Sequence, residues 1–419
     1  MPDPNAADPS GRPELYDVGG VLLPRPFKIR RFGHFGYNTD RLDESLRFFT
    51  DVLGFRVTDE ADLFESVPPE VRAKAEAVVT DPRMYFTSHG SDHHALLLAH
   101  RTFGTFNRND RYAPDNTLSQ ITWQVGGLRE VADAVGYLRE RGVRIGRVGR
   151  DMPGSNWHVY FLDPDGNTLE LYYGMEQIGW GRNSKPRAMH DRAFDRAPEL
   201  PQMSEAAEVR EARARGVDVD SGWRPDEAHL DERHDVEGVL LPRPFKVTKL
   251  GPVSMFTADL DGMLAFYTDV MGFAVTETAD VDGHRVAFLR HGAEHHSLVL
   301  ADKALRERLR LSPHTSNLSM GMEVGTYRQL RDAVEFLTER GFERRDDLPA
   351  DLHRGIDLAA YFTAPDGHLV QLYYYMETVG WDGRPRPREQ RRDVSGAWPE
   401  TLEPLSDTYT DQTFMGPLG

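Results

Sequence analysis

Hydrophobic and polar positions in the first part of the chain predict a strand, a helix and then three more strands. Residues 32–38 alternate in polarity as a half-buried strand does. Residues 42–53 carry apolar side chains at helical spacing and are followed by Gly54, which predicts a helix that ends at a glycine. The strands expected next are 55–58, 84–88 and 94–99.

The same order of elements returns between residues 118 and 173. A strand is expected at 118–125 and a helix at 128–141, just before Gly142. A hairpin follows, with strands 157–162 and 168–173 on either side of the turn sequence Asp163-Pro-Asp-Gly-Asn167. The first half of the chain therefore contains two βαβββ modules.

The second half of the chain repeats the first in the same order. Residues 17–28, 48–55, 93–94, 160–166 and 171–180 return as residues 235–246, 266–273, 295–296, 361–367 and 372–381. Self-similarity over this length indicates a duplication. The predicted fold is therefore α+β, with four βαβββ modules paired into two duplicated domains.

The periodic segments and the charged or proline-rich segments divide the chain into five parts. We expect an N-terminal extension (1–27), a first domain (28–180), a linker (181–234), a second domain (235–383) and a C-terminal tail (384–419). The linker is charged, and residues 205–215 within it have the pattern of a surface helix.

Composition limits the kinds of partner and of metal site. The net charge of −17 argues against nucleic acids and anionic membranes as partners. The absence of cysteine excludes disulfides and thiolate ligands, and residues 1–20 contain no apolar signal segment. Together these features favour a cytoplasmic protein.

Over residues 28–174 and 246–375 the chain resembles the vicinal oxygen chelate superfamily, which includes glyoxalases, bleomycin-resistance proteins and extradiol dioxygenases. The resemblance rests on the four βαβββ modules and on the Asp-Pro-Asp-Gly-Asn turn, which is followed four residues after its glycine by Glu170. The four-module layout is most similar to the two-domain type I extradiol ring-cleaving dioxygenases. The resemblance implies that each pair of modules curls into a cup, and that a metal lies in one of them.

The resemblance places the metal ligands in the first half of the chain. In the extradiol enzymes the ligands are a His on the first strand of one module, a His on the first strand of the next, and a Glu on the last strand. His34 and Glu170 match the first and third positions, whereas Gln120 stands at the second. The implied cofactor is Fe(II), and the oxygen donor of Gln120 also makes Mn(II) possible.

Candidate catalytic residues follow from the same resemblance. His93 matches a proton-transferring His, with His94 as the close alternative, and Tyr160, ten residues before Glu170, matches a Tyr that binds the substrate oxygen. On a symmetric hairpin Tyr160 faces Glu170, and His158 shares that face. A further family His falls on Asp151, which is a departure from the extradiol pattern.

The second half lacks the ligand set, because Pro252, Met320 and Gln371 stand where His34, Gln120 and Glu170 stand in the first. We therefore expect this half to be metal-free. It nevertheless repeats the His-His pair and the Tyr, which favours a structural role for these residues in at least one half. A lone strand histidine is also more often a core residue than a ligand. Gln120, for its part, can either ligate the metal or hydrogen-bond a substrate.

The leading hypothesis is a metal-dependent extradiol-type dioxygenase that cleaves a catechol or related dihydroxyaromatic ring with O2. One alternative is a redox-silent metal-dependent isomerase, epimerase or lyase of the same fold, which Gln120 and Asp151 favour. A second alternative is a small-molecule binding or resistance protein without a metal. The resemblance also implies a small aromatic substrate and a homo-oligomer.

Overall fold

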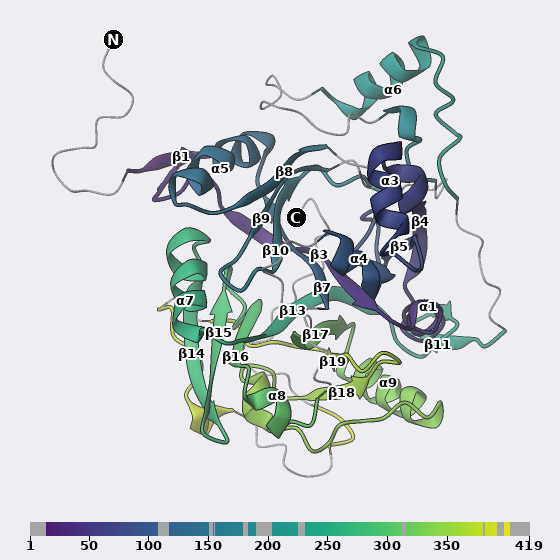
Figure 1. The fold of residues 1–419 in the computed structure, drawn as a ribbon. Helices are drawn as coiled ribbons and strands as arrows, with labels where there is room; N and C mark the ends of the chain where they lie inside the picture. Colours follow the sequence, from purple (N-terminus) through teal and green to yellow (C-terminus); the bar gives the residue numbers. More distant parts are fainter. Residues whose placement is uncertain are drawn as a thin grey trace.

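The chain folds into two similar mixed α+β halves, the N-terminal half above and the C-terminal half below in Figure 1. The computed structural model describes residues 14–107, 117–150, 154, 156–178, 183–189, 203–224, 231–311, 316–379, 382–391 and 398–402. The predicted fold class and the duplication are confirmed.

The N-terminal half is built on one sheet of eight strands in the order β4-β5-β6-β3-β7-β10-β9-β8. The strands are β3 (Ile29–Thr39), β4 (Arg56–Asp62), β5 (Arg83–Ser88), β6 (Leu96–His100), β7 (Leu118–Val125), β8 (Ile145–Arg150), β9 (Trp157–Leu162) and β10 (Thr168–Tyr173). Antiparallel pairing of β3 with β7 joins the two modules, so the first strand of each module lies at the centre of the sheet.

The C-terminal sheet has the same order, β14-β15-β16-β13-β17-β19-β18. Its strands are β13 (Val247–Thr257), β14 (Ala274–Val281), β15 (His284–Arg290), β16 (Leu298–Asp302), β17 (Asn317–Val324), β18 (Ala359–Thr363) and β19 (Leu369–Tyr373). At the position of β8, the described residues of this half show a single bridge between Arg344 and Phe362.

Three of the five described helices of the N-terminal half recur in the C-terminal half, whereas the two between β4 and β5 do not. The N-terminal half has α1 (Leu42–Arg47), α2 (Leu63–Ser66), α3 (Pro69–Glu76), α4 (Arg101–Asn107) and α5 (Leu128–Glu140), and the C-terminal half has α7 (Leu260–Ala265), α8 (Leu305–Arg308) and α9 (Tyr327–Glu339). Between them lies α6 (Glu205–Ala214), the helix expected in the linker. Short 3-10 turns occur at Arg187–Met189, Ala350–His353 and Arg388–Gln390.

Most elements agree with the sequence pattern. Strands β7, β9 and β10 have the predicted bounds. The predicted helix over residues 42–53 is α1 continued by a π-helical turn, Phe48–Val52. The pattern did not predict α2, α3 or β8, because these segments are short and lack a clear apolar period.

The repeated proline-arginine-proline segments tie the halves together. Each follows a two-stranded hairpin, β1–β2 (Tyr16–Val18, Val21–Leu23) or β11–β12 (His234–Val236, Val239–Leu241). Arg25 of the first segment donates to the carbonyl oxygen of Gly272, at 3.3 Å. Arg243 of the second donates to the carbonyls of Thr50 and Asp51, each at 3.4 Å. Each half therefore contacts the other through hydrogen bonds from an arginine to backbone carbonyl groups.

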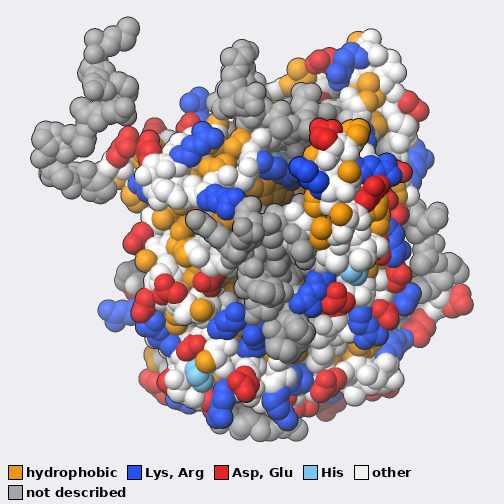
Figure 2. Space-filling view, viewed as in Figure 1, with side chains coloured by type: hydrophobic (Ala, Val, Ile, Leu, Met, Phe, Trp, Pro, Cys, Tyr) orange, Lys and Arg blue, Asp and Glu red, His pale blue; other side chains and the backbone are white. Residues whose placement is uncertain are grey.

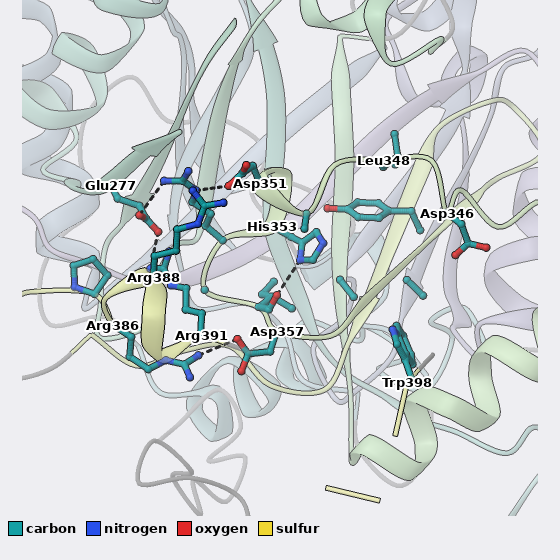
Figure 3. Close-up of a pocket in the computed structure, with 18 of the residues that line it drawn as sticks. Glu277, Asp346, Leu348, Asp351, His353, Asp357, Arg386, Arg388, Arg391 and Trp398 are labelled. Atoms are coloured by element: carbon teal, nitrogen blue, oxygen red, sulfur yellow. Dashed lines mark hydrogen bonds and ion pairs between the residues drawn. The ribbon is translucent and has the colours of Figure 1, made fainter. Parts of the chain in front are cut away.

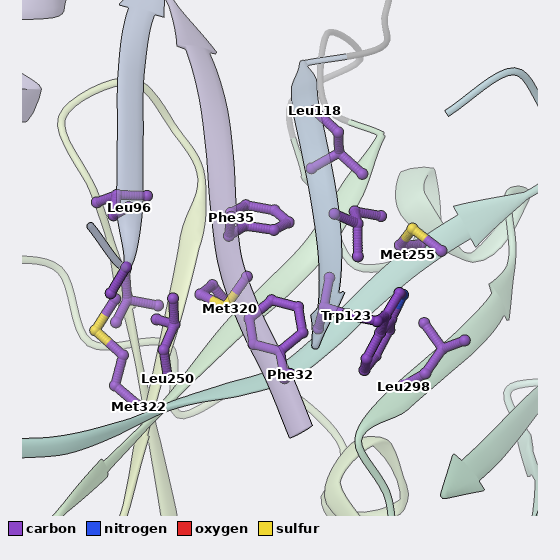
Figure 4. Close-up of a cluster of buried hydrophobic side chains, with 14 of the residues drawn as sticks. Phe32, Phe35, Leu96, Leu118, Trp123, Leu250, Met255, Leu298, Met320 and Met322 are labelled. Carbon is purple, nitrogen blue, oxygen red and sulfur yellow. The ribbon is translucent and has the colours of Figure 1, made fainter. Parts of the chain in front are cut away.

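The hydrophobic core is continuous across the two halves (Figure 4). Phe32, Phe35 and Trp123 of the N-terminal sheet belong to the same cluster as Met320 and Met322 of the C-terminal sheet. Trp123 packs edge-on against Phe273, with ring centroids 4.9 Å apart. Phe35 and Trp123 thus occupy the face opposite the candidate site, as strand alternation predicted.

The surface is of mixed charge. On the face seen in Figure 2, basic and acidic side chains are interspersed among the described residues. Within the described part of the chain, we find no helix long and apolar enough to cross a membrane.

Candidate metal centre

Three adjacent central strands carry the predicted ligands of the N-terminal half. His34 lies on β3, Gln120 on β7 and Glu170 on β10. Strand β7 pairs antiparallel with β3 and parallel with β10, so that Gln120 lies opposite Gly36 and Thr122 lies opposite Glu170. Because alternate residues share a face, the three side chains project from the same side of the sheet.

His34 and Glu170 converge in the interior. His34 Nε2 lies 3.0 Å from Glu170 Oε2, and the two side chains are 1% and 0% exposed. Despite this distance, Glu170 Oε2 accepts no well-directed hydrogen bond from any described residue. Two ligand atoms at about 2.1 Å from an octahedral cation, at right angles to each other, are about 3.0 Å apart. The separation of the two atoms is therefore compatible with shared coordination of a divalent metal ion.

Gln120 is the candidate for the third donor. Its Oε1 accepts a hydrogen bond of 3.4 Å from the hydroxyl of Tyr160. Tyr160 lies directly opposite Glu170 on the β9–β10 hairpin, as the symmetric turn predicted. Within the described residues no group of three His, Asp or Glu side chains could hold a metal, so the site has three protein ligands only if the amide of Gln120 is one of them.

Asn156 and His158 lie beside the second carboxylate oxygen of Glu170, Oε1. Asn156 Nδ2 donates to Glu170 Oε1 at 2.5 Å, and His158 Nδ1 lies 3.9 Å from the same oxygen. Burial alone would raise the pKa of Glu170, but the neighbouring His34 and His158 lower it below its ordinary value. The group therefore remains a carboxylate, which is the form that binds a cation.

Of the two adjacent histidines, His94 lies next to the candidate ligand His34. The ring of His94 lies edge-on to that of His34, with centroids 4.2 Å apart. His93 lies behind it, with its Nε2 3.2 Å from Asp59 Oδ2 and its Nδ1 3.1 Å from His94 Nδ1. The sequence comparison favoured His93 as the proton-transferring residue, whereas the geometry brings His94 to the site.

We assign the tautomers of the two rings from these contacts, taking both rings as neutral. Asp59 accepts the Nε2 hydrogen of His93, which leaves His93 Nδ1 to accept from His94 Nδ1. His94 Nε2 is then the unprotonated nitrogen. Burial, followed by the neighbouring His34 and His93, lowers the pKa of His94 well below its ordinary value, so its ring is neutral.

Comparison with known proteins settles the family. The Glyoxalase/Bleomycin resistance protein/Dioxygenase superfamily model matches residues 31–171 and again 249–372. The chain belongs to this superfamily. The duplicated match also agrees with the two sheets described above.

Two curated relatives are catechol-cleaving by name. Catechol-2,3-dioxygenase of Bacillus subtilis (strain 168) is 24% identical over 276 residues, which cover 64% of this chain and 74% of that protein. Metapyrocatechase 2 of Cupriavidus necator is 26% identical over 176 residues, 41% of this chain and 46% of the relative.

Solved structures of the superfamily share the fold. The 2,3-dioxygenase LapB from Pseudomonas sp. KL28 is 13% identical, with a TM-score of 0.53, and the match covers 86% of this chain and 96% of LapB. A Mn(II)-bound glyoxalase from Novosphingobium aromaticivorans is 15% identical, with a TM-score of 0.50, and the match covers 85% of each chain. At these identities the likeness shows the fold alone.

The C-terminal superfamily domain keeps part of the candidate site without the candidate ligands, and the strand register places Ser319, not Met320, at the position of Gln120. Gln371 Nε2 donates to the hydroxyl of Tyr361 at 2.9 Å, and the two residues are paired across β18 and β19 as Tyr160 and Glu170 are paired in the other half. His295 repeats the arrangement of His93, with its Nε2 2.8 Å from Glu277 and its Nδ1 3.0 Å from His296. The acid–His–His chain thus occurs in both halves, whereas the candidate ligand set occurs in one.

A cavity of about 1150 Å³ opens beside β18 in the C-terminal half. Ion pairs line it: Arg391 lies 2.7 Å from Glu277, and Arg386 lies 3.2 Å from Asp357 (Figure 3). Basic and acidic groups therefore largely neutralise each other in this cavity. Its counterpart position in the N-terminal half is the face that carries Tyr160 and His158.

Sequence reasoning missed three residues that contact the site: Asp59, Thr122 and Asn156. The signal for two of them is the internal repeat, because the residues at the positions of Thr122 and Asn156 in the C-terminal half are Gly321 and Asp357, and so differ as the candidate ligands do. Asp59 gives no such signal, because another acidic residue, Glu277, stands at the same position of the C-terminal half. Asp151 lies outside the described residues.

Proposed function

We propose that the chain is a metal-dependent extradiol-type dioxygenase that cleaves the ring of a catechol or related dihydroxyaromatic with O2. The observation that carries the proposal is the 3.0 Å approach of His34 Nε2 to Glu170 Oε2 without hydrogen-bonding geometry. The names of the curated relatives support the substrate class. His34, Gln120 and Glu170 would hold Fe(II) or Mn(II), which when bound would chelate two vicinal oxygens and lower the pKa of a substrate hydroxyl.

The surrounding residues have separate tasks in this proposal. The unprotonated Nε2 of His94 accepts a proton from the substrate, and Asp59 acts through His93 to keep that nitrogen free. The hydroxyl of Tyr160 is held by a long hydrogen bond of 3.4 Å to Gln120, so it can turn to donate to a substrate oxygen. His158 lines the same face one residue pair further along the hairpin.

A redox-silent metal-dependent isomerase, epimerase or lyase is the second candidate. The amide oxygen at Gln120 favours it, because an oxygen donor in place of imidazole suits metals that do not activate O2. This enzyme would act on a metal-chelated substrate without consuming oxygen.

Oxygen uptake distinguishes the two candidates. Purified protein reconstituted anaerobically with Fe(II), and separately with Mn(II), would be mixed with catechol in an oxygen electrode while the absorbance of a ring-cleaved product is recorded. We expect uptake of one O2 for each catechol consumed. Metal binding without uptake across a panel of catechols would favour the redox-silent enzyme, and no metal binding would favour a binding protein.

The duplicated half supplies a matched control. Tyr160→Phe should lower kcat roughly 100- to 1000-fold through loss of one positioned donor. Tyr361→Phe makes the same change at the equivalent position of the C-terminal half and should leave kcat unchanged. Equal effects of the two substitutions would argue against an active site at Tyr160.

A further inference from the structure

The backbone at His34 departs from regular sheet geometry. The β3–β7 ladder pairs Phe32 with Trp123 and next Phe35 with Ile121, so two residues of β3, Gly33 and His34, face one residue of β7. Such a bulge re-aims a side chain and leaves backbone groups without ladder partners. The residue of β7 that faces the bulge is Thr122.

The side chain of Thr122 satisfies both backbone groups of His34. Its Oγ1 accepts from the His34 N–H at 2.6 Å and donates to the His34 carbonyl oxygen at 2.7 Å. Thr122 is fully buried, so these two bonds replace the missing ladder in a place that excludes water. One hydroxyl therefore fixes the peptide groups on both sides of the His34 Cα.

The ring of Tyr172 fills the space next to Gly33 and His34. A Cβ on Gly33 would lie 2.7 Å from Thr122 Oγ1 and would collide with the ring of Tyr172. The ring of Tyr172 in turn lies 5.2 Å from that of His34, measured between centroids. His34 is thus held at its backbone by Thr122 and at its ring by Tyr172.

The C-terminal half, which lacks the candidate ligands, also lacks this pair of hydrogen bonds. Its bulge is at Gly251-Pro252, and the residue of β17 that faces it is Gly321, which has no hydroxyl and cannot form either hydrogen bond. There the hydroxyl of Tyr373, the counterpart of Tyr172, donates to the carbonyl oxygen of Gly251 at 2.9 Å. Both halves therefore have the bulge, but only the half that has His34 has the threonine.

We propose that Thr122 is the positioning residue for the metal ligand His34, setting the direction of its imidazole through the two backbone hydrogen bonds. The proposal rests on the metal site of the proposed function. Misdirecting one ligand weakens a metal site, and loss of a partner that orients a ligand typically lowers metal affinity roughly 10- to 100-fold.

The test compares Thr122→Val, which keeps the shape and removes the hydroxyl, with Thr122→Ser, which keeps the hydroxyl. Binding of Mn(II) to the metal-free full-length protein would be measured by calorimetry, with thermal unfolding of the same samples. Thr87→Val is the matched control: Thr87 is buried in the same sheet and its hydroxyl donates to Leu96 O at 3.2 Å, away from the site.

We expect Thr122→Val to bind Mn(II) roughly 10- to 100-fold more weakly, with Thr122→Ser close to wild type and Thr87→Val unchanged. Equal affinity of wild type and Thr122→Val would overturn the inference. So would equal weakening in Thr87→Val, since the effect would then follow from general destabilisation. Failure of the wild type itself to bind metal would instead reject the proposed function.

Discussion

Asn156 donates a hydrogen bond of 2.5 Å to Glu170 Oε1, which leaves Oε2 as the carboxylate oxygen directed at His34. Both side chains are buried, and in the C-terminal half the acid and the amide exchange places as Gln371 and Asp357. The pair therefore differs between the halves in the same way as the metal ligands do.

Removing this hydrogen bond should weaken the metal site. Asn156→Ala frees the carboxylate to rotate, and we expect roughly 10-fold weaker metal binding. Calorimetric titration of the metal-free variant with Mn(II) measures the change, and the thermal unfolding of the same sample reports any loss of folding. Wild-type affinity in a folded Asn156→Ala protein would mean that Asn156 does not orient Glu170.

Asp163 should make stability depend on pH. It is buried in the hairpin turn, where it accepts from Asn167 at 2.8 Å and from Tyr267 of the other half at 3.4 Å. Burial raises its pKa from 3.8 to about 7, because the hydrogen bonds only partly offset desolvation. A raised folded-state pKa favours the protonated form, so its stabilising effect is complete below pH 3.8 and is lost as the pH rises through 7.

Urea unfolding between pH 4 and 7 tests this sign. Relative to Asp163→Asn, the wild type should lose free energy of unfolding as the pH rises, by at most about 1.4 kcal/mol for each pH unit. Parallel pH profiles for the two proteins would show that the carboxyl group has an ordinary pKa in the folded state.

Trp123 should stabilise both halves at once. It is fully buried and packs against Phe273 of the other half. Trp123→Ala is expected to cost about 3–5 kcal/mol and to lower the temperature of a single cooperative transition in scanning calorimetry. Leu240→Ala, at a side chain that is 67% exposed, should change stability by less than about 0.5 kcal/mol. Two transitions, of which only one moves, would show that the halves unfold independently.

The sequence predicted the fold well because its signals are local or repeated. Strand alternation and the symmetric turn sufficed to place Tyr160 opposite Glu170, and the register is as expected. Which of His93 and His94 lies beside His34 was not predictable, because it depends on how the loop before β6 turns, and adjacent residues of an extended segment point in opposite directions. The two hydrogen bonds of Thr122 to the His34 backbone depend on a two-residue bulge in β3, and the pattern of apolar residues does not reveal this bulge.

The contacts between halves were also beyond sequence reasoning. Proline in the repeated segments around Arg25 and Arg243 indicates an extended backbone but does not predict what the arginines contact. These arginines reach carbonyl groups of the opposite half. Pairing of distant segments of this kind is set by the packing of the two sheets and not by local propensity.

Metal content tests the central claim most directly. Protein purified without chelator or oxygen would be analysed by elemental mass spectrometry as wild type, as Glu170→Gln and as Gln371→Glu, which places the same carboxylate in the C-terminal half. We predict about one iron or manganese ion per chain in the wild type and in Gln371→Glu, and none in Glu170→Gln. Wild-type protein that binds no stoichiometric metal after reconstitution, or Glu170→Gln that retains it, would contradict the account.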